Sequence, residues 1–325
     1  MIKKLLFFLF VAMATPDAHA VNVTMTTDAT FNNHAIIATM ERNLGAVLTE
    51  INNANNANRD LDIRGLKMNK YAQDALLMLW ANIHFYCDDD EVVDRCWNLK
   101  NGYIVRQIPL IINVGNNEFG SGNYQEAVVE FDRNGVISDF RFALDRQLSE
   151  SMERCGDVVE LERKLIILGY VERFRTAYNT KDINFLEQVF SDDALIITGK
   201  TVMTKKAGDF GGASIDVVYT KQTKQQYLTN LRRAFQRNKY IKVEFQEIGD
   251  GGAGGCGGVT RSANNANMYG VRLKQKWQST NYSDEGYVFL LWDFTDETSP
   301  QIHVRTWQPN LVNEKDIFSL SNFNL

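Results

Sequence analysis

The chain has 325 residues, 44% of them hydrophobic, and 40 acidic against 35 basic side chains give a formal net charge of −5. This balance argues against nucleic-acid binding, because neutralising a phosphate backbone requires a basic surface. Four prolines and 11% aromatic residues indicate a folded chain with little disordered linker. The length is that of about two domains of roughly 150 residues each.

The first twenty residues have the pattern of a secretory signal peptide. Lys3 and Lys4 precede the apolar stretch Leu5–Ala14, and residues 18–20 supply an A-x-A exit. The apolar stretch is too short to cross a hydrocarbon core of ~30 Å as a helix. We therefore expect cleavage after Ala20, a periplasmic or secreted protein, and no membrane-spanning segment.

Export would carry all four cysteines into a compartment that permits disulfides. Cys87 and Cys96 bracket a short acidic loop and are the favoured pair, and Cys155 and Cys256 would then pair by default, although three connectivities stay open. No Cys-x-x-Cys motif occurs, no histidine stands at a metal-ligand spacing, and the acidic loop lacks the pattern of a calcium loop. We expect neither a metal site nor a cofactor.

The first half shows helical periodicity followed by strand patterns. Apolar residues recur at three and four over 31–53 and over 67–84, which predicts two helices. Strands are expected at 102–114, 124–132 and 136–144. Asn134 and Gly135 predict a hairpin between the last two strands.

The second half repeats this order of helices first and a hairpin last. Helices are expected at 158–178, 183–190 and 223–238, the last capped by Thr223, and strands at 194–199, 240–248, 268–279, 286–294 and 301–308. The G-x-G-x-x-G segment at 249–254 predicts a loop, because no helix follows it to bind a pyrophosphate. We therefore expect two tandem α+β domains that meet near residues 146–157.

Two motifs in the second half carry a family resemblance. Residues 177–182 read AYNTKD, and residues 190–194 read FSDDA. They resemble the helix-ending turn and the entry to the first strand of NTF2-like (SnoaL-type, cystatin-like) domains, and the chain also resembles exported Bacteroidetes proteins that carry such a domain. The resemblance is good over 158–310 and holds only in element order over 25–148, with a C-terminal tail at 311–325. It implies tandem NTF2-like domains, each with helices packed on a curved antiparallel sheet.

Candidate functional residues concentrate on the last two expected strands. Asp293 is the polar residue of an apolar strand and would have a raised pKa in a pocket, or else would simply bond a neighbouring group at the strand end. Alternation over 302–308 places His303, Arg305 and Trp307 on one side and Ile302, Val304 and Thr306 on the other. The first set would face either an anionic or aromatic ligand, with His303 as general base, or a domain or dimer interface.

Tyr178 and Trp292 complete the predicted ligand-binding set with Arg305 and Trp307. The resemblance does not define an activity, because the family includes isomerases, hydrolases, small-ligand binders and association domains. The first hypothesis is an exported, non-catalytic protein that binds a small hydrophobic or anionic ligand, or an envelope protein or second copy through a sheet face. The alternative is an isomerase or hydrolase acting on a hydrophobic molecule in the cone of the second domain through Asp293 and His303. An enzyme predicts that these two residues converge in one pocket, whereas a binding protein predicts a cone without such a pair.

Overall fold

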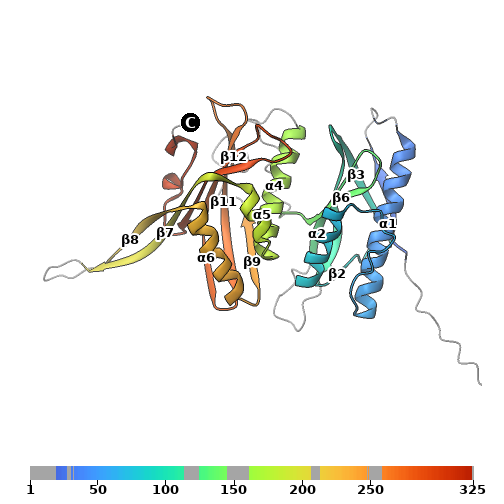
Figure 1. The fold of residues 1–325 in the computed structure, drawn as a ribbon, viewed down its shortest axis with the longest axis horizontal. Helices are drawn as coiled ribbons and strands as arrows, with labels where there is room; N and C mark the ends of the chain where they lie inside the picture. Colours follow the sequence, from blue (N-terminus) through green and yellow to red (C-terminus); the bar gives the residue numbers. More distant parts are fainter. Residues whose placement is uncertain are drawn as a thin grey trace, which may run out of the picture.

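The computed structural model describes residues 20–27, 31, 33–112, 124–144, 161–205, 213–246, 248 and 258–323. Four features expected from the sequence lie outside these ranges: residues 1–19 of the signal peptide, the domain junction, Cys155 and Cys256. The described strands form two sheets, each with its own helices, and they appear as two neighbouring units in Figure 1. None of the described helices has the length and apolar run that a membrane crossing requires.

The first unit packs two helices on one face of a twisted sheet. Its elements are β1 (Asn22–Thr26), α1 (His34–Ala57), α2 (Lys70–Asn82), β2 (Phe85–Tyr86), β3 (Glu91–Leu99), β4 (Gly102–Ile112), β5 (Tyr124–Phe131) and β6 (Ile137–Phe142). Asn33 and Asn69 cap the two helices, each accepting a hydrogen bond from a backbone N–H three residues on. The order of the described strands is β1-β3-β4-β5-β6, with β2 beside β4, and among them only β1 runs parallel to its neighbour. The sequence pattern predicts both helices and the β5–β6 hairpin but not β1, β2 or β3.

The second unit has three helices and a longer sheet. Its elements are α4 (Leu161–Asn179), α5 (Ile183–Val189), β7 (Phe190–Lys205), β8 (Ala213–Thr223), α6 (Lys224–Arg237), β9 (Ile241–Gln246), β10 (Val259–Arg261), β11 (Met268–Ser279), β12 (Tyr282–Asp293) and β13 (Gln301–Pro309). The order of the described strands is β10-β11-β12-β13-β7-β8, with β9 beside β11, and among them only β13 and β7 run parallel. Thr223 forms the predicted cap of α6 as part of a capping box. The sequence pattern does not predict β8.

The two faces of the second sheet are covered in different ways. The helices cover one face and enclose the larger core of this unit. On the other face, Phe318 and Phe323 of the C-terminal segment pack against Phe289, Leu291 and Val304. The Gln308 side chain holds this segment, because its amide donates to the carbonyl of Asp316 and accepts from the N–H of Phe318. Part of this second face is therefore covered by the C-terminal segment of the chain itself.

These arrangements confirm the predicted fold class. Each unit has helices packed on a mainly antiparallel sheet, and the two units follow one another along the chain. In both units the helices precede the terminal hairpin, as the order of the sequence patterns predicts.

The expected Cys87–Cys96 disulfide is not formed, since both side chains are buried and free. The sheet register explains this result. Cys96 lies opposite Val105 on β4, whereas Tyr86, the residue before Cys87, lies opposite Ile111. At about 3.3 Å per residue the two cysteines are more than about 10 Å apart along β4, beyond the Cα separation of roughly 7 Å that a disulfide tolerates. Burial also raises the pKa of Cys87 to about 11 and that of Cys96 to about 12, so both stay unreactive thiols.

Asp94 on β3 predicts a pH-dependent stability of the first unit. Burial, followed by the charges of Glu126 and Asp89, raises the pKa of Asp94 to about 6. Between the ordinary pKa of about 4 and this value, the folded protein keeps a proton that the unfolded chain releases, so stability falls as the pH rises through that range. We expect Asp94→Asn to raise the free energy of unfolding at pH 7.5 by up to about 2 kcal/mol, and to change it little at pH 3.5.

Urea unfolding at the two pH values measures this effect. Asp90→Asn is the matched control, because Asp90 is an exposed carboxylate of the preceding loop. A gain in stability that is equal at both pH values would show that the charge of Asp94 is not its cause.

Candidate functional site

The space between the helices and the sheet of the second unit, here called the cone, is filled at its centre by aromatic side chains. Phe174 of α4 is fully buried, and its ring lies 5.0 to 6.4 Å from the rings of Tyr178, Phe190, Phe245 and Trp292. Edge-on and stacked rings at these distances stabilise each other beyond the area that they bury. The centre of the cone is therefore packed with apolar rings.

Arg305 of β13 is a buried charged residue of the cone. It is 5% exposed, and its guanidinium lies 5.2 Å from the centre of the Tyr227 ring and hydrogen-bonds Tyr178. The Tyr178 and Tyr227 hydroxyls are themselves 2.6 Å apart. Burial alone lowers the pKa of Arg305, but the two tyrosines and Asp284 outweigh it and raise the pKa above its usual value, so the side chain is charged.

The Arg305 guanidinium lacks a paired carboxylate. No ion pair joins it to any acidic side chain in the described ranges, and its Nε has no hydrogen-bond partner there. Removing a charge from water costs several kcal/mol unless the charge is paired. The structure therefore places a buried positive charge without a direct ion pair inside the cone, and this arrangement favours an anion beside it.

Asp284 of β12 is the acidic residue whose negative charge raises the pKa of Arg305. It faces the cone, because Val288, Leu290 and Trp292, at alternate positions of the same strand, belong to the cone core. Its Oδ2 accepts a 2.7 Å hydrogen bond from the Tyr282 hydroxyl, whereas its Oδ1 is buried without a partner. Burial raises the pKa of Asp284, and Tyr282 and Arg305 reduce that effect without reversing it.

Three of the predicted ligand-binding residues also lie in the cone with Arg305. Tyr178 and Trp292 are buried in its core, and Trp307 packs against that core from β13. The indole N–H groups of Trp292 and Trp307 are both buried without a partner. The predicted set therefore comes together, but Asp284 was missed. The expected strand begins at Gly286, four residues after the actual start at Tyr282, so the sequence pattern does not place Asp284 on its inward face.

His303 does not lie on the same side as Arg305 and Trp307, which corrects the expected alternation. A β-bulge between Ile302 and Val304 shifts the register, so that Ile302 joins the cone core and Val304 packs on the opposite face. His303 lines an open groove on that opposite face, beside Leu195 and Phe318. One inserted residue therefore separates the histidine from the guanidinium.

Asp293 meets His303 outside the cone. The Nε2 atom of His303 is 3.6 Å from Asp293 Oδ2, and its Nδ1 atom is 3.6 Å from Asp193 Oδ1. Asp293 Oδ1 accepts hydrogen bonds from the N–H and the hydroxyl of Thr295, at 2.8 and 2.6 Å. Asp293 thus has the bonding of a strand-end carboxylate. Asp293 and His303 lie close together, but on the face of the sheet that points away from the cone.

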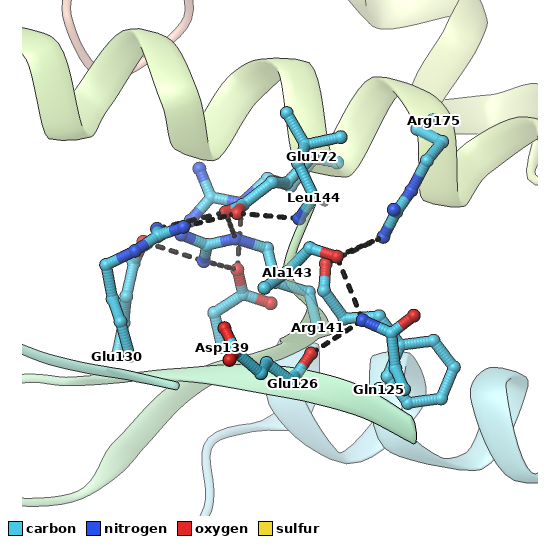
Figure 2. A network of polar contacts seen from close by, with 12 residues as sticks. Gln125, Glu126, Glu130, Asp139, Arg141, Ala143, Leu144, Glu172 and Arg175 are labelled. Atoms are coloured by element: carbon cyan, nitrogen blue, oxygen red, sulfur yellow. Dashed lines mark hydrogen bonds and ion pairs between the residues drawn. The ribbon is translucent and has the colours of Figure 1, made fainter. Parts of the chain in front are cut away.

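A buried polar network holds α4, and with it Tyr178, against the first unit (Figure 2). Glu172 of α4 is fully buried and accepts hydrogen bonds from Arg106 of β4, at 2.6 Å, and from Arg141 of β6, at 2.9 Å. It also accepts one from the Leu144 N–H at 3.2 Å. Both carboxylate oxygens of Glu172 therefore accept hydrogen bonds from residues that precede α4 in the chain, and this carboxylate joins the two units.

The neighbouring residues of α4 extend this network. Arg173 pairs with Asp139 and Glu130, each at 2.9 Å, and Arg141 pairs with the same two carboxylates at 2.6 and 2.8 Å. Burial by itself raises the pKa of Glu130, but the two arginines outweigh it and lower the pKa to about 2. Glu130 consequently stays charged over the physiological range.

Metal chemistry has no evident site in the described ranges, where no group of three His, Cys, Asp or Glu side chains is placed to hold an ion.

No family model matches the chain, and no curated protein matches its sequence. Among solved structures, Bd1075 of Bdellovibrio bacteriovorus is similar at 11% identity and a TM-score of 0.32, over 54% of this chain and 47% of that one. This chain thus spans about half the length of that protein. A conserved protein from Planctomyces limnophilus is 13% identical, with a TM-score of 0.33, over 46% of this chain and 99% of its own. Nuclear transport factor 2 of Cryptosporidium parvum is 8% identical, with a TM-score of 0.30, over 44% and 90%. Similarity at this level carries no argument about function.

Proposed function

We propose that the second unit is a binding module for a small organic anion, which it holds in the cone on Arg305. The observation that carries the proposal is the buried guanidinium that no described carboxylate pairs. An anionic ligand would supply the missing counter-charge, and charge-assisted hydrogen bonds to arginine are among the stronger polar contacts in proteins. Trp307 would supply a second donor through its indole N–H.

The wider proposal is an exported, non-catalytic protein of two tandem NTF2-like units. The N-terminal sequence pattern supports export. The order of helices and strands in the second unit, with β7 beside the last strand β13, supports the NTF2-like assignment. The ion-pair network between α4 and the first sheet supports a role of the first unit as a support that holds the binding unit in place.

Arg305→Met tests the proposal. Isothermal titration with benzoate and 3-phenylpropionate is expected to detect binding to the wild type and a loss of at least about tenfold in the variant, since hydrogen bonds to charged groups contribute about 1.5–3 kcal/mol. Without ligand, the variant is expected to be at least as stable as the wild type, because an unpaired buried charge has been removed.

Arg237→Met is the matched control, because Arg237 is exposed on α6 and its replacement changes the net charge equally. Benzamide and 3-phenylpropanol, which lack the carboxylate, are expected not to bind. Equal binding of acids and neutral analogues, or unchanged binding to the Arg305 variant, would contradict the proposal.

A catalytic alternative has one observation in its favour, the raised pKa of Asp284 in the cone. A carboxyl group whose pKa is moved toward neutrality is suited to proton transfer. An isomerase or hydrolase in this cone would therefore use Asp284 and not Asp293 and His303. Turnover of a bound acid that Asp284→Asn abolishes would favour this alternative.

A further inference from the structure

The second sheet ends in a long edge strand, β8. It has 11 residues, contains no proline, and pairs with β7 in one continuous register without a bulge. No described strand lies on its other side. Every second residue of an edge strand directs its backbone N–H and C=O away from the sheet, and these groups pair readily with another extended chain. β8 is therefore suited to accept a further strand.

Apolar side chains of β7 and β8 are exposed on both faces of this edge. Ile215, Val218 and Tyr219 are 53%, 51% and 41% exposed, and Met203, opposite Ile215 on β7, is 76% exposed. In Figure 1 the β7–β8 hairpin projects beyond the helices of its unit. A two-stranded ribbon is only marginally stable in water, so a third strand that buries these side chains would stabilise it.

A groove of about 600 Å³ lies between the C-terminal part of β8 and α6. The described side chains that line it are all basic or neutral polar: Thr220, Lys221, Gln222, Gln225, Gln226, Thr229, Asn230 and Arg233. Amide side chains both donate and accept hydrogen bonds, so they suit the peptide groups of a bound segment. The groove therefore continues the strand edge with groups that match a polar main chain and negative side chains.

Lys221 and Arg233 are the basic residues of this groove. In the described chain neither forms an ion pair, whereas the neighbouring Lys224 and Arg232 each pair with a carboxylate. Lys221 also lines the groove that contains His303, on the face of the sheet away from α6, while Arg233 comes from α6 itself. One cation therefore flanks the edge on each face. Neighbouring residues of a strand point to opposite faces, so two adjacent acidic residues would meet both cations.

We propose that β8 accepts an extended acidic segment of another protein as an additional strand. The main chain of the segment pairs with β8, and two adjacent acidic residues lie against Lys221 and Arg233. A second copy of this chain fits less well, because its β8 offers a single carboxylate, Asp216, and carries Lys221 of its own. This surface does not use Arg305, so the docking of a segment stands or falls independently of the anion site in the cone.

Fluorescence anisotropy of labelled peptides added to the full chain tests the charge preference. The peptide TVTEEVTV is expected to bind at least about tenfold more tightly than TVTKKVTV, with TVTQQVTV between them, because each exposed ion pair contributes up to about fivefold in affinity. Equal binding of the three peptides, or tighter binding of TVTKKVTV, overturns the proposal.

Two N-methylated forms of TVTEEVTV test the strand geometry. In one form the methyl groups occupy the odd-numbered amide nitrogens, and in the other they occupy the even-numbered ones. Only one of these sets faces β8 in an added strand, so one form is expected to lose binding and the other to keep it. An equal effect of the two methylation patterns excludes strand addition.

The double variant Lys221→Glu, Arg233→Glu is expected to prefer TVTKKVTV over TVTEEVTV. Arg237→Glu with Lys239→Glu is the matched control, because both residues are exposed near the end of α6 and outside the groove. The control should keep the preference for the acidic peptide, and far-UV circular dichroism shows that both variants are folded. An unchanged preference of the first variant contradicts the proposal. A dimer in sedimentation velocity that binds none of the peptides would assign the edge to a second copy and likewise overturn it.

Discussion

Replacing Glu172 with alanine is expected to lower the free energy of unfolding by about 3–5 kcal/mol. The variant leaves the Arg106 and Arg141 guanidinium groups buried without the carboxylate that both contact. Their exposed fractions are 7% and 1%, so water cannot replace the lost partner. Urea unfolding followed by far-UV circular dichroism measures the effect. Because Glu172 joins α4 to the first sheet, we also expect the two units of the variant to unfold in separate transitions.

Glu187→Ala provides the control for Glu172. Glu187 pairs with Arg232 at 2.7 Å, but both side chains are about half exposed, so its loss is expected to cost less than about 1 kcal/mol. Similar effects of the two substitutions would show that the pairs of Glu172 contribute no more than surface ion pairs. A double-mutant cycle with Arg106→Met isolates the pairwise coupling, which should be large for a buried pair.

Replacing Phe174 with alanine is expected to destabilise the second unit by about 3–5 kcal/mol. The ring is fully buried and contacts four other aromatic rings, so its removal leaves a cavity that the rigid neighbours fill only in part. The near-UV circular dichroism of the cone aromatics should weaken as well. Differential scanning calorimetry, in which the second unit would melt earlier than the first, measures the change.

Phe174→Leu and Met203→Ala complete this experiment. Leucine keeps much of the buried volume, so Phe174→Leu should cost clearly less than the alanine substitution. Met203 is 76% exposed on β7, and its truncation should change little. A loss at Phe174 no greater than that at Met203 would be incompatible with a packed cone.

The sequence predicted the parts of this fold that depend on local periodicity. Leu168, Val171, Phe174 and Tyr178 recur at three and four residues, and they all face the core of the second unit from α4. The Thr223 cap and the Asn134–Gly135 hairpin were predicted for the same reason, because each depends on residues that are close along the chain. Short or polar strands such as β1 to β3 carry no such period, so they were missed.

The structure brings some of the predicted site residues together and separates others, and the separations have one origin. Arg305 and Trp307 share the cone, but His303 does not, because strand alternation assumes an unbroken register. The bulge at residues 302–304 arises where β13 pairs with β7, about one hundred positions earlier in the chain. The disulfide expectation failed in the same way, since short separation in sequence did not bring Cys87 and Cys96 together once β4 had set their positions.

By itself the sequence determined the helices, most inward-facing apolar residues and the order of two α+β units, because these follow from side-chain periods over a few turns or strand residues. Only the tertiary structure decided that Glu172 is buried between the units, that the C-terminal segment packs on one face of the second sheet, and that Arg305 has no carboxylate partner among the described residues. A charged residue on a helix has the same local pattern whether it faces water or another sheet. Burial and pairing depend on segments far apart in the chain, and the free energy of a charge depends on that surrounding.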